Sequence, residues 1–387
     1  MMRGYSGNAS ITLKTAWLTS LLLCREVVSQ TDLKGGIITR TDVKEYADLA
    51  LDVRDIRSLA KSGQKSQVLG LYEEGEHSEI TPGFRYSLKK MSDDLVDANP
   101  RTPHLLFHLY GLADLATNVP LLSEQSRYAD GFIRDMINSN IDLAADSVVA
   151  LIMWMYGTHL LWSGVKTCEL RTAADNPDMI PLGDGGMDEF IALWIGTDQQ
   201  PGTGDGHSLY AWAHAAGDKF GVNSPEAIVN SRIKLLYQEG ATALSLKHAC
   251  TKDNKQTQQQ LWNVATRMTN EMVKPLFQWL TFHIVEEKNP DAVTLYALAL
   301  VPQLARCRPS IYKRLKENLI DRSINFDLAS VILEDLQEAY ACFGFACEDI
   351  GMGSGFRSRC DLYESQRSLA GYRPTSDVFE VNSALWH

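Results

Sequence analysis

Two stretches of this chain repeat one short pattern of residues far apart in the sequence. Residues 66–75 (SQVLGLYEEG) align with residues 231–240 (SRIKLLYQEG), and five of the ten positions are identical. Residues 142–144 and 327–329 both read Asp-Leu-Ala, and each opens a long apolar-periodic stretch. The second pair lies slightly farther apart than the first, and the polar stretch 252–260 can absorb much of the difference. A duplicated unit is therefore predicted, although matches this short also arise by chance.

Both repeated units have the residue spacing of helices. In the second unit apolar side chains recur along one face, and Gly240 is expected to end that helix. A further apolar face follows Asp327, whose carboxylate is expected to cap the helix start. The residues of the two faces are Ile228, Ile233, Leu236, Tyr237, Leu328, Val331, Ile332, Leu336 and Ala339. Strand-like alternation is scarce, so the predicted fold class is all-α, with two duplicated helical units packed together.

Glycine and acidic residues are concentrated between the two units, at 184–189 and 200–206. Glycine and proline at this density predict loops, so a glycine-rich connector is expected to join the units. Neither run ends in Gly-Lys-Ser/Thr or follows a strand, which argues against a phosphate-binding loop. The predicted organisation is a signal peptide at 1–29, an N-terminal segment at 30–65, unit one at 66–171, the connector at 172–229, unit two at 230–355 and a tail at 356–387.

The first residues have the pattern of a secretory signal peptide. Arg3 and Lys14 precede the apolar run 16–24, and small residues lead to an expected cut after Ser29. The alternative interpretation is a frayed N-terminal helix of a cytosolic protein. Export would remove Cys24 and leave six cysteines, an even number that suits an oxidising compartment.

The spacing of those six cysteines favours disulfides over a zinc site. They are Cys168, Cys250, Cys307, Cys342, Cys347 and Cys360. The last three lie close together, which predicts at least one bridge in the C-terminal part of the chain. No CxxC pair occurs, so zinc is poorly supported. Buried, reduced thiols are the alternative.

The charge balance restricts the partners of this chain. Its 37 Lys and Arg residues are outnumbered by 48 Asp and Glu residues, which gives a formal net charge of −11. Nucleic acid is therefore excluded as an expected partner, because phosphate contacts need a basic face. The most apolar stretch, 147–162, is interrupted by Tyr156, Gly157 and His159 and is shorter than the roughly 20 residues of a spanning helix.

Six short motifs occur in order along the chain: LDVRDI at 51–56, LYEEG at 71–75, DEFIALWIG at 188–196, SLYA at 208–211, CFGFACEDIG at 342–351 and LAGYRPTSDV at 369–378. This series resembles the low-iron-inducible periplasmic proteins of algae, the Fea1 family, to which diatom phytotransferrins are related. The resemblance implies a secreted or surface protein that assimilates iron, with ferric binding assisted by carbonate in the phytotransferrins. The chain differs from the family after Ser-Asp-Val at 376–378. It also shows no apolar tail, so a membrane-attached form is not expected.

One local group has the residue types that ferric iron prefers. This hard cation favours phenolate and carboxylate oxygens and accepts imidazole. Asp205, His207, Tyr210 and His214 fall across a loop and the helix that it opens, and the last three share one helix face. Asp218 continues that face. The spacing predicts a mixed nitrogen and oxygen metal site, and the alternative is a packing tyrosine beside solvent-facing histidines.

Three further groups hold metal-binding residue types at spacings that do not favour a site. They are the pairs Tyr72/Glu74 and Tyr237/Glu239, the acidic run Asp184, Asp188 and Glu189, and the pair His104/His108. Each tyrosine and its glutamate point to different helix faces, so the tyrosines are expected in the core. The acidic run lacks EF-hand spacing, and Asp188 is expected to cap the helix that follows it. The histidine pair lacks the glutamate of HExxH, and no GxSxG elbow marks a nucleophile.

These observations support three functions in decreasing order. The first is a secreted, periplasmic or cell-surface protein that binds ferric iron for uptake without catalysis, aided by a negative surface that concentrates cations. The second is an extracellular structural or interaction protein that has lost the metal site. The third is a secreted enzyme linked to inorganic carbon, because the resembled family has been associated with the response to CO₂. No catalytic set is recognisable for that third function.

Overall fold

The part of the chain that the structure describes is mainly helical, which confirms the all-α prediction. A computed structural model describes residues 30–33, 36–97, 128–174, 184–305, 307–321 and 323–351. The α-helices are α2 (Lys44–Lys61), α3 (Lys65–Glu74), α4 (Leu88–Asp97), α6 (Tyr128–Ser139), α7 (Ala144–Ser147), α8 (Trp154–Ala173), α9 (Asp184–Ile195), α10 (Leu209–Phe220), α11 (Ile228–Ser245), α12 (Lys255–Phe282), α13 (Pro290–Leu300), α14 (Pro309–Leu319), α15 (Ala329–Ala339) and α16 (Cys347–Ile350). The predicted signal peptide, 1–29, the predicted tail, 356–387, and the last four residues of predicted unit two, 352–355, lie outside the described residues.

Short 3₁₀ and π segments extend several of these helices. The 3₁₀ segments are η2 (Ile141–Leu143), η6 (Val301–Leu304), η7 (Phe326–Leu328) and η8 (Tyr340–Phe343), and the π segments are η3 (Val148–Met153) and η5 (His283–Glu287). Two antiparallel ribbons complete the described fold. They pair β1 (Asp32–Leu33) with β2 (Ile37–Ile38) and β3 (Glu79–Thr81) with β4 (Phe84–Arg85).

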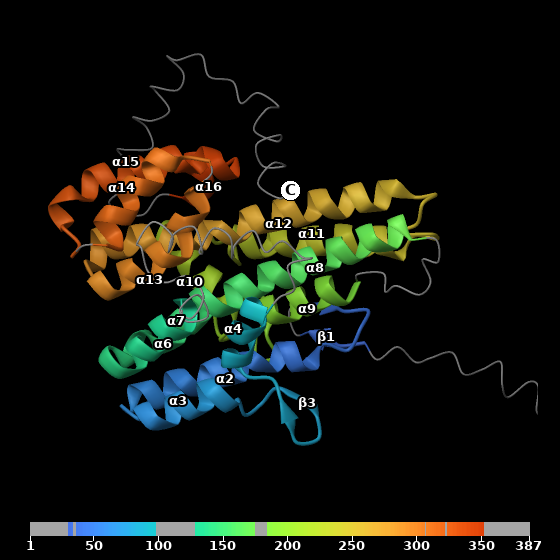
Figure 1. Ribbon diagram of the computed structural model, residues 1–387, viewed down its shortest axis with the longest axis horizontal. Helices are drawn as coiled ribbons and strands as arrows, with labels where there is room; N and C mark the ends of the chain where they lie inside the picture. The colour runs from blue at the N-terminus through green and yellow to red at the C-terminus, as the bar shows by residue number, and fades with distance from the viewer. Residues whose placement is uncertain are drawn as a thin grey trace, which may run out of the picture.

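The helices stack in layers along the long axis of the molecule (Figure 1). Helices α8 and α12 pack against each other in the middle, with α9 against α8 and α11 against α12. Helix α2 packs on α9 and on α3, whereas α14, α15 and α16 lie at the opposite edge of the molecule. Buried side chains from Leu33 to Ile350 form one continuous hydrophobic core. Described residues from both predicted units belong to this one core, and the duplication stays a prediction.

A long apolar helical rod lies at the centre of the bundle. Residues 141–173 form one continuous helical rod, and it is the only helix among the described residues that is long and apolar enough to cross a membrane. However, 83% of its apolar window is buried inside the fold, which is the environment of a core helix. The indole N–H of Trp154 donates to the carbonyl of Met272 on α12 at 2.8 Å and ties the two central helices together.

The segment expected to be a loop-like connector contains two core helices, α9 and α10. The apolar run 190–195 of α9 is fully buried between α2 and α8. Glycine serves close packing here, since a Cβ at Gly186 would lie 2.5 Å from the carbonyl oxygen of Leu160 on α8. The prediction took glycine density as a loop signal, whereas part of it marks a close helix–helix contact. Loop structure is found at 196–208, between the two helices.

The first repeated pattern places its two tyrosines in equivalent settings. Tyr72 and Tyr237 are both buried, which confirms the expected core role. Each donates its hydroxyl proton to an aspartate of another helix, Tyr72 to Asp130 at 3.0 Å and Tyr237 to Asp188 at 2.6 Å. Both copies of the pattern thus contain a buried tyrosine that donates to an aspartate of another helix.

The glycines that follow these tyrosines behave differently. Gly75 ends α3 with a φ of +65°. The expected stop at Gly240 is wrong, because α11 continues to Ser245. A Cβ at Gly240 would lie 2.3 Å from the methyl carbon of Met187, so this glycine allows α9 and α11 to approach closely.

The second repeated pattern also adopts one local structure in both copies. The Asp-Leu of each copy lies in a 3₁₀ turn, η2 or η7, and the alanine begins an α-helix. The expected cap at Asp327 is wrong: Asn325 is the capping residue, and its side-chain oxygen accepts from the Asp327 N–H at 3.0 Å. Of the predicted apolar face, Ile332, Leu336 and Ala339 are buried. The remaining two members, Leu328 and Val331, are exposed.

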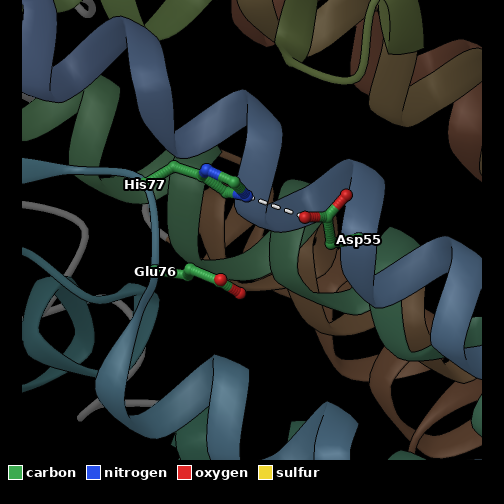
Figure 2. A group of neighbouring side chains, drawn as sticks. All are labelled: Asp55, Glu76 and His77. Atoms are coloured by element: carbon green, nitrogen blue, oxygen red, sulfur yellow. Dashed lines mark hydrogen bonds and ion pairs between the residues drawn. The ribbon is translucent and has the colours of Figure 1, made fainter.

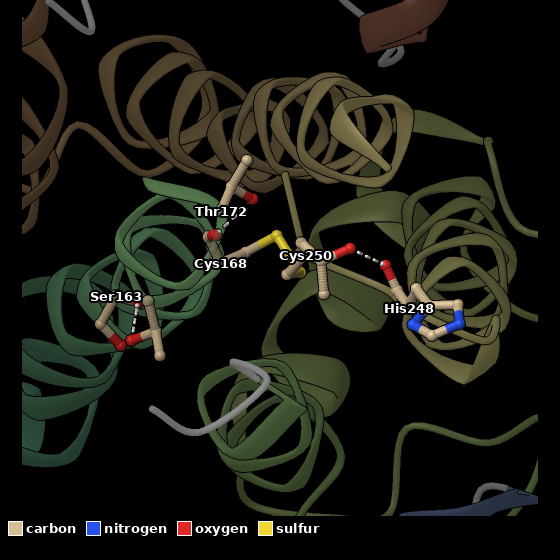
Figure 3. Close-up of a disulfide and its surroundings, with 7 residues drawn as sticks. Ser163, Cys168, Thr172, His248 and Cys250 are labelled. Atoms are coloured by element: carbon tan, nitrogen blue, oxygen red, sulfur yellow. Dashed lines mark hydrogen bonds between the residues drawn. A yellow bond between two sulfur atoms is a disulfide. The ribbon is translucent and has the colours of Figure 1, made fainter. Parts of the chain in front are cut away.

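Two disulfides join segments that are distant in sequence. Cys168 near the end of α8 is bonded to Cys250 in the loop after α11, with 5.0 Å between the Cα atoms (Figure 3). Cys307 is bonded to Cys342, which confirms the expected bridge in the C-terminal part. Both half-cystines of the first bridge are fully buried. Disulfides of this kind fit the predicted oxidising compartment.

Candidate functional site

One group of metal-ligating side chains converges at the surface of the first helices. Within the described ranges, only one group of three or more His, Cys, Asp or Glu residues has its ligand atoms within 4.8 Å of one another. This group consists of Asp55, Glu76 and His77. Asp55 comes from the exposed side of α2, and the other two come from the segment between α3 and β3. Figure 2 shows the His77 ring directed at Asp55, with Nε2 2.7 Å from Oδ2, and Glu76 directed toward the same space.

A buried carboxylate below this group holds the segment that carries it. Asp52 lies one helical turn before Asp55 and is fully buried. Its Oδ1 accepts the backbone N–H groups of Glu76 at 3.0 Å and His77 at 3.1 Å. The helix end at Gly75 turns the chain so that these two N–H groups face Asp52. The geometry of two of the three candidate ligands therefore depends on Asp52.

The charges around Asp55 keep its carboxylate ionised. Partial burial acts to raise the pKa of Asp55, but the contacts with Arg54 and His77 outweigh it and hold the pKa below its usual value. The Nε of Arg54 donates to Asp55 Oδ1 at 2.8 Å. This contact, together with the nearby carboxylate of Asp198, raises the pKa of the Arg54 guanidinium. A carboxylate that stays ionised is the form in which Asp55 can bind a cation.

A cleft opens beside this group. It has a volume of about 510 Å³ and lies between α2, α3 and the start of the β3–β4 ribbon. Its charged lining consists of Asp55, Glu74, Glu76 and Arg85. Three carboxylates against one guanidinium give the cleft a net negative lining, which favours cations over anions.

The four residues predicted as a metal site have separate partners. His207 precedes α10, because Ser208 is the residue before the helix, and its Nδ1 lies 2.6 Å from Asp198 Oδ2. Tyr210 is buried and donates to Glu226. His214 lies 3.7 Å from Asp218, and Asp205 is exposed in the loop. The structure does not bring Asp205, His207 and His214 together as a ligand group, and the expectation that His207 shares a helix face with the others is wrong.

The other sequence-predicted groups have structural roles or lie outside the described residues. The expected cap at Asp188 is wrong, because α9 begins at Asp184 and Asp188 lies inside it. Asp188 instead accepts hydrogen bonds from the backbone N–H groups of Arg40 and Thr41 at 2.8 Å each. Glu74 is exposed and Glu239 is half-buried, whereas Tyr72 and Tyr237 are buried in the core. The pair His104/His108 falls in 98–127, which is not among the described residues.

Comparisons with known proteins leave the chain without an assigned family. No family model, curated protein or solved structure matches it. The resemblance to the Fea1 family therefore stays a prediction, and the functional argument depends on the side chains themselves.

Asp52 offers a test of how the candidate site is held. Burial raises the pKa of Asp52 to about 6, despite the two backbone hydrogen bonds that oppose the shift. The folded state then holds this proton more tightly than the unfolded chain, so the stability contributed by Asp52 is present below about pH 4 and is lost as the pH rises to about 6. Asp52→Asn removes this pH dependence and keeps an acceptor oxygen for the loop. Urea denaturation from pH 4 to pH 7 is expected to show a stability curve that is flatter for Asp52→Asn than for the wild type.

The matched Asp52→Ala variant separates charge from hydrogen bonding. It also lacks the titrating group, but it leaves the N–H groups of Glu76 and His77 without their acceptor. We expect it to be less stable than Asp52→Asn by about 2 kcal/mol at pH 7, because each unpaired buried donor costs about 1–3 kcal/mol. Equal stability of the two variants would show that Asp52 does not hold this segment.

Proposed function

We propose that this chain is a secreted or cell-surface iron-assimilation protein that binds ferric iron at Asp55, Glu76 and His77 without catalysis. The observation that carries the proposal is the convergence of two carboxylates and one imidazole within 4.8 Å of one another. Carboxylate oxygen with one imidazole nitrogen is a ligand set that suits iron. Water, carbonate or another small ligand would complete the coordination, because three protein ligands leave positions open.

Three further features support binding of a cation at this place. Despite partial burial, the contacts with Arg54 and His77 lower the pKa of Asp55, which favours its ionised form. The adjoining cleft has a net negative lining. Asp52 fixes the backbone of the two loop ligands, so they need not be ordered by the metal. Pre-ordered ligands bind more tightly than flexible ones because less entropy is lost on binding.

The alternative function is an extracellular structural protein in which the same residues form an ion pair only. The direct contact of 2.7 Å between His77 and Asp55 favours this alternative, because it satisfies both groups without a metal. Metal binding would replace this contact, since the imidazole must be neutral to act as a ligand. The enzyme hypothesis gains no specific support from the site.

Equilibrium dialysis against ferric nitrilotriacetate distinguishes these functions. The double variant Asp55→Asn/His77→Gln removes two of the three proposed ligands, and we expect it to lose one bound iron per chain. The affinity for that iron is expected to fall at least 100-fold, because loss of a residue that only supports a ligand already lowers metal affinity about 10–100-fold. The matched variant Asp205→Asn/His207→Gln carries the same two kinds of change in the group predicted from sequence, and it is expected to retain that iron. Asp253→Asn, in an exposed loop, controls for the loss of one surface charge.

Each outcome of this experiment has a definite meaning. Loss of iron only in Asp205→Asn/His207→Gln would place the site in the group predicted from sequence. Absence of binding above a buffer control in the wild type, with and without carbonate, would favour the structural protein over the iron-binding one.

A further inference from the structure

Two adjoining clefts follow the seam between α11 and α12, and in Figure 1 these helices and α2 lie on opposite sides of α8 and α9. The clefts have volumes of about 400 Å³ and 660 Å³. Glu239 and Arg267 line both clefts, and their charged groups are 3.0 Å apart, so the two clefts form one groove. Along α12 it extends from Gln256 to Lys274, which is about 27 Å along a helix axis. We call it the α11–α12 groove.

The charged side chains that line the groove are paired with one another. The guanidinium of Arg232 lies 3.0 Å from Asp349 and 3.2 Å from Glu271. The ammonium of Lys274, a buried residue, lies 2.8 Å from the same Glu271. With the pair shared by the two clefts, the lining has three cations and three carboxylates. The groove is therefore neutral in a chain of net charge −11, and it has no net field that would select an ion.

Unpaired side-chain amides supply hydrogen-bonding groups along the groove. Five of them line it: Gln256, Gln259, Gln260, Asn263 and Asn270. Among the described residues, none of these five amides has a side-chain hydrogen bond to the protein. Each carries one acceptor oxygen and an amino group that donates. Three of the five come from the polar stretch 252–260, to which neither the core nor the proposed iron site gives a role.

Aromatic rings lie toward both ends of the groove. Trp262 is half-buried in the amide-rich cleft, and its ring packs against that of Trp162 on α8 with 5.8 Å between the centroids. Phe343 and Phe345 line the cleft that contains Lys274, and their ring centroids are 5.6 Å apart. A polar groove with aromatic rings held by packing suits a ligand that has both hydrogen-bonding edges and apolar faces.

We propose that the α11–α12 groove binds an extended, neutral oligosaccharide. Sugar hydroxyls both donate and accept hydrogen bonds, as side-chain amides do. The C–H faces of sugar rings are apolar and can pack on aromatic side chains. A neutral ligand leaves the paired charges balanced, whereas an ionic ligand would leave one of them without its partner. The inference goes beyond iron binding and does not depend on it.

An extended polypeptide is the other polymer that could lie along such a groove. Peptides commonly add a strand to an exposed sheet edge or lay an apolar helix face into an apolar groove. Both long walls of the α11–α12 groove are helices, and amide and charged side chains make up most of its lining. These properties favour a polyhydroxylated ligand over a polypeptide.

Isothermal titration calorimetry of the iron-free protein with neutral hexasaccharides tests the proposal. The probes are cellohexaose, laminarihexaose, mannohexaose and xylohexaose, and the wild type is expected to bind at least one of them with one molecule per chain. Hexagalacturonate, a charged sugar of the same length, is not expected to bind. Gln259→Ala/Asn263→Ala removes two exposed amides and is expected to weaken binding by about 10-fold or more. Alanine favours the helix, so this variant is expected to fold.

Two matched variants separate the groove from general effects. Gln238→Ala/Asn318→Ala makes the same two kinds of change outside the groove and is expected to keep the wild-type affinity for the sugar. Asp55→Asn/His77→Gln is also expected to keep it, so failure of the iron proposal would not affect this result.

Three outcomes would overturn the oligosaccharide site. The first is a wild type that binds none of the neutral hexasaccharides. The second is an unchanged affinity in Gln259→Ala/Asn263→Ala. The third is binding of an unfolded polypeptide, reduced and carboxymethylated lactalbumin, in place of the sugars, which would assign the groove to polypeptides.

Discussion

Serine in place of both Cys168 and Cys250 is expected to lower the free energy of unfolding by about 4.5 kcal/mol. The bridge spans 82 residues of sequence. A crosslink over a loop of that length restricts the unfolded chain and stabilises the fold by about this amount at 25 °C. It also ties the end of α8 to the loop after α11. Urea denaturation of the wild type and the double serine variant, both without reductant, measures the difference.

The second disulfide serves as the matched control for this prediction. Cys307→Ser/Cys342→Ser opens a bridge that spans 35 residues. The loss in the free energy of unfolding is expected to be about 0.7 kcal/mol smaller for this variant than for Cys168→Ser/Cys250→Ser. The reason is that the entropy of loop closure grows with the logarithm of loop length. A Cys168→Ser/Cys250→Ser protein as stable as the wild type would show that this bridge does not form in the native protein.

Replacing Asp188 with alanine is expected to destabilise the fold by about 4 kcal/mol. Asp188 is 1% exposed and accepts four hydrogen bonds. Three come from the backbone N–H groups of Arg40 and Thr41 and the hydroxyl of Thr41, at 2.8 to 2.9 Å, and one comes from Tyr237 at 2.6 Å. Removing one partner of a buried charged network typically costs about 3–5 kcal/mol, because the donors left behind are desolvated and unpaired.

Tyr237→Phe is the control for the Asp188 prediction. It removes one of the four donors and leaves the carboxylate with the other three, so we expect a loss of only about 1 kcal/mol. Thermal or urea unfolding measures both variants under the same conditions. A loss below 1 kcal/mol in Asp188→Ala would mean that Asp188 does not join α9 to the N-terminal segment and α11.

The helical fold could be predicted from sequence because its signal is local. Apolar residues at helical spacing on α11 and α15 required no knowledge of the tertiary structure, and most of them are buried. The connector was predicted poorly because glycine has two uses. Gly186 permits contact between α8 and α9, and Gly240 permits contact between α9 and α11. Only the packing partner distinguishes such glycines from those of a loop.

The candidate site could not be predicted in the same way because its residues are not close together in the sequence. Asp55 meets Glu76 and His77 only through the turn between α2 and α3 and the end of α3 at Gly75. His77 follows the first copy of the repeated pattern and has no counterpart after the second, so the pattern itself did not predict it as a ligand.

The group predicted from sequence shows how much depends on a helix boundary. Three of its members share a face only if the helix includes His207. The helix begins at Leu209, so His207 is free to contact Asp198 in the preceding loop. Tyr210 faces Glu226 in the core instead of a solvent-accessible site. A shift of two residues in the helix start therefore separates the predicted ligands.

Diffraction from iron-loaded crystals at the iron absorption edge tests the central claim most directly, because anomalous scattering locates each bound iron. The proposal predicts an anomalous peak between the carboxylates of Asp55 and Glu76 and the imidazole of His77. Iron-loaded crystals with no peak at these three residues, and with the contact between His77 and Asp55 intact, would contradict it.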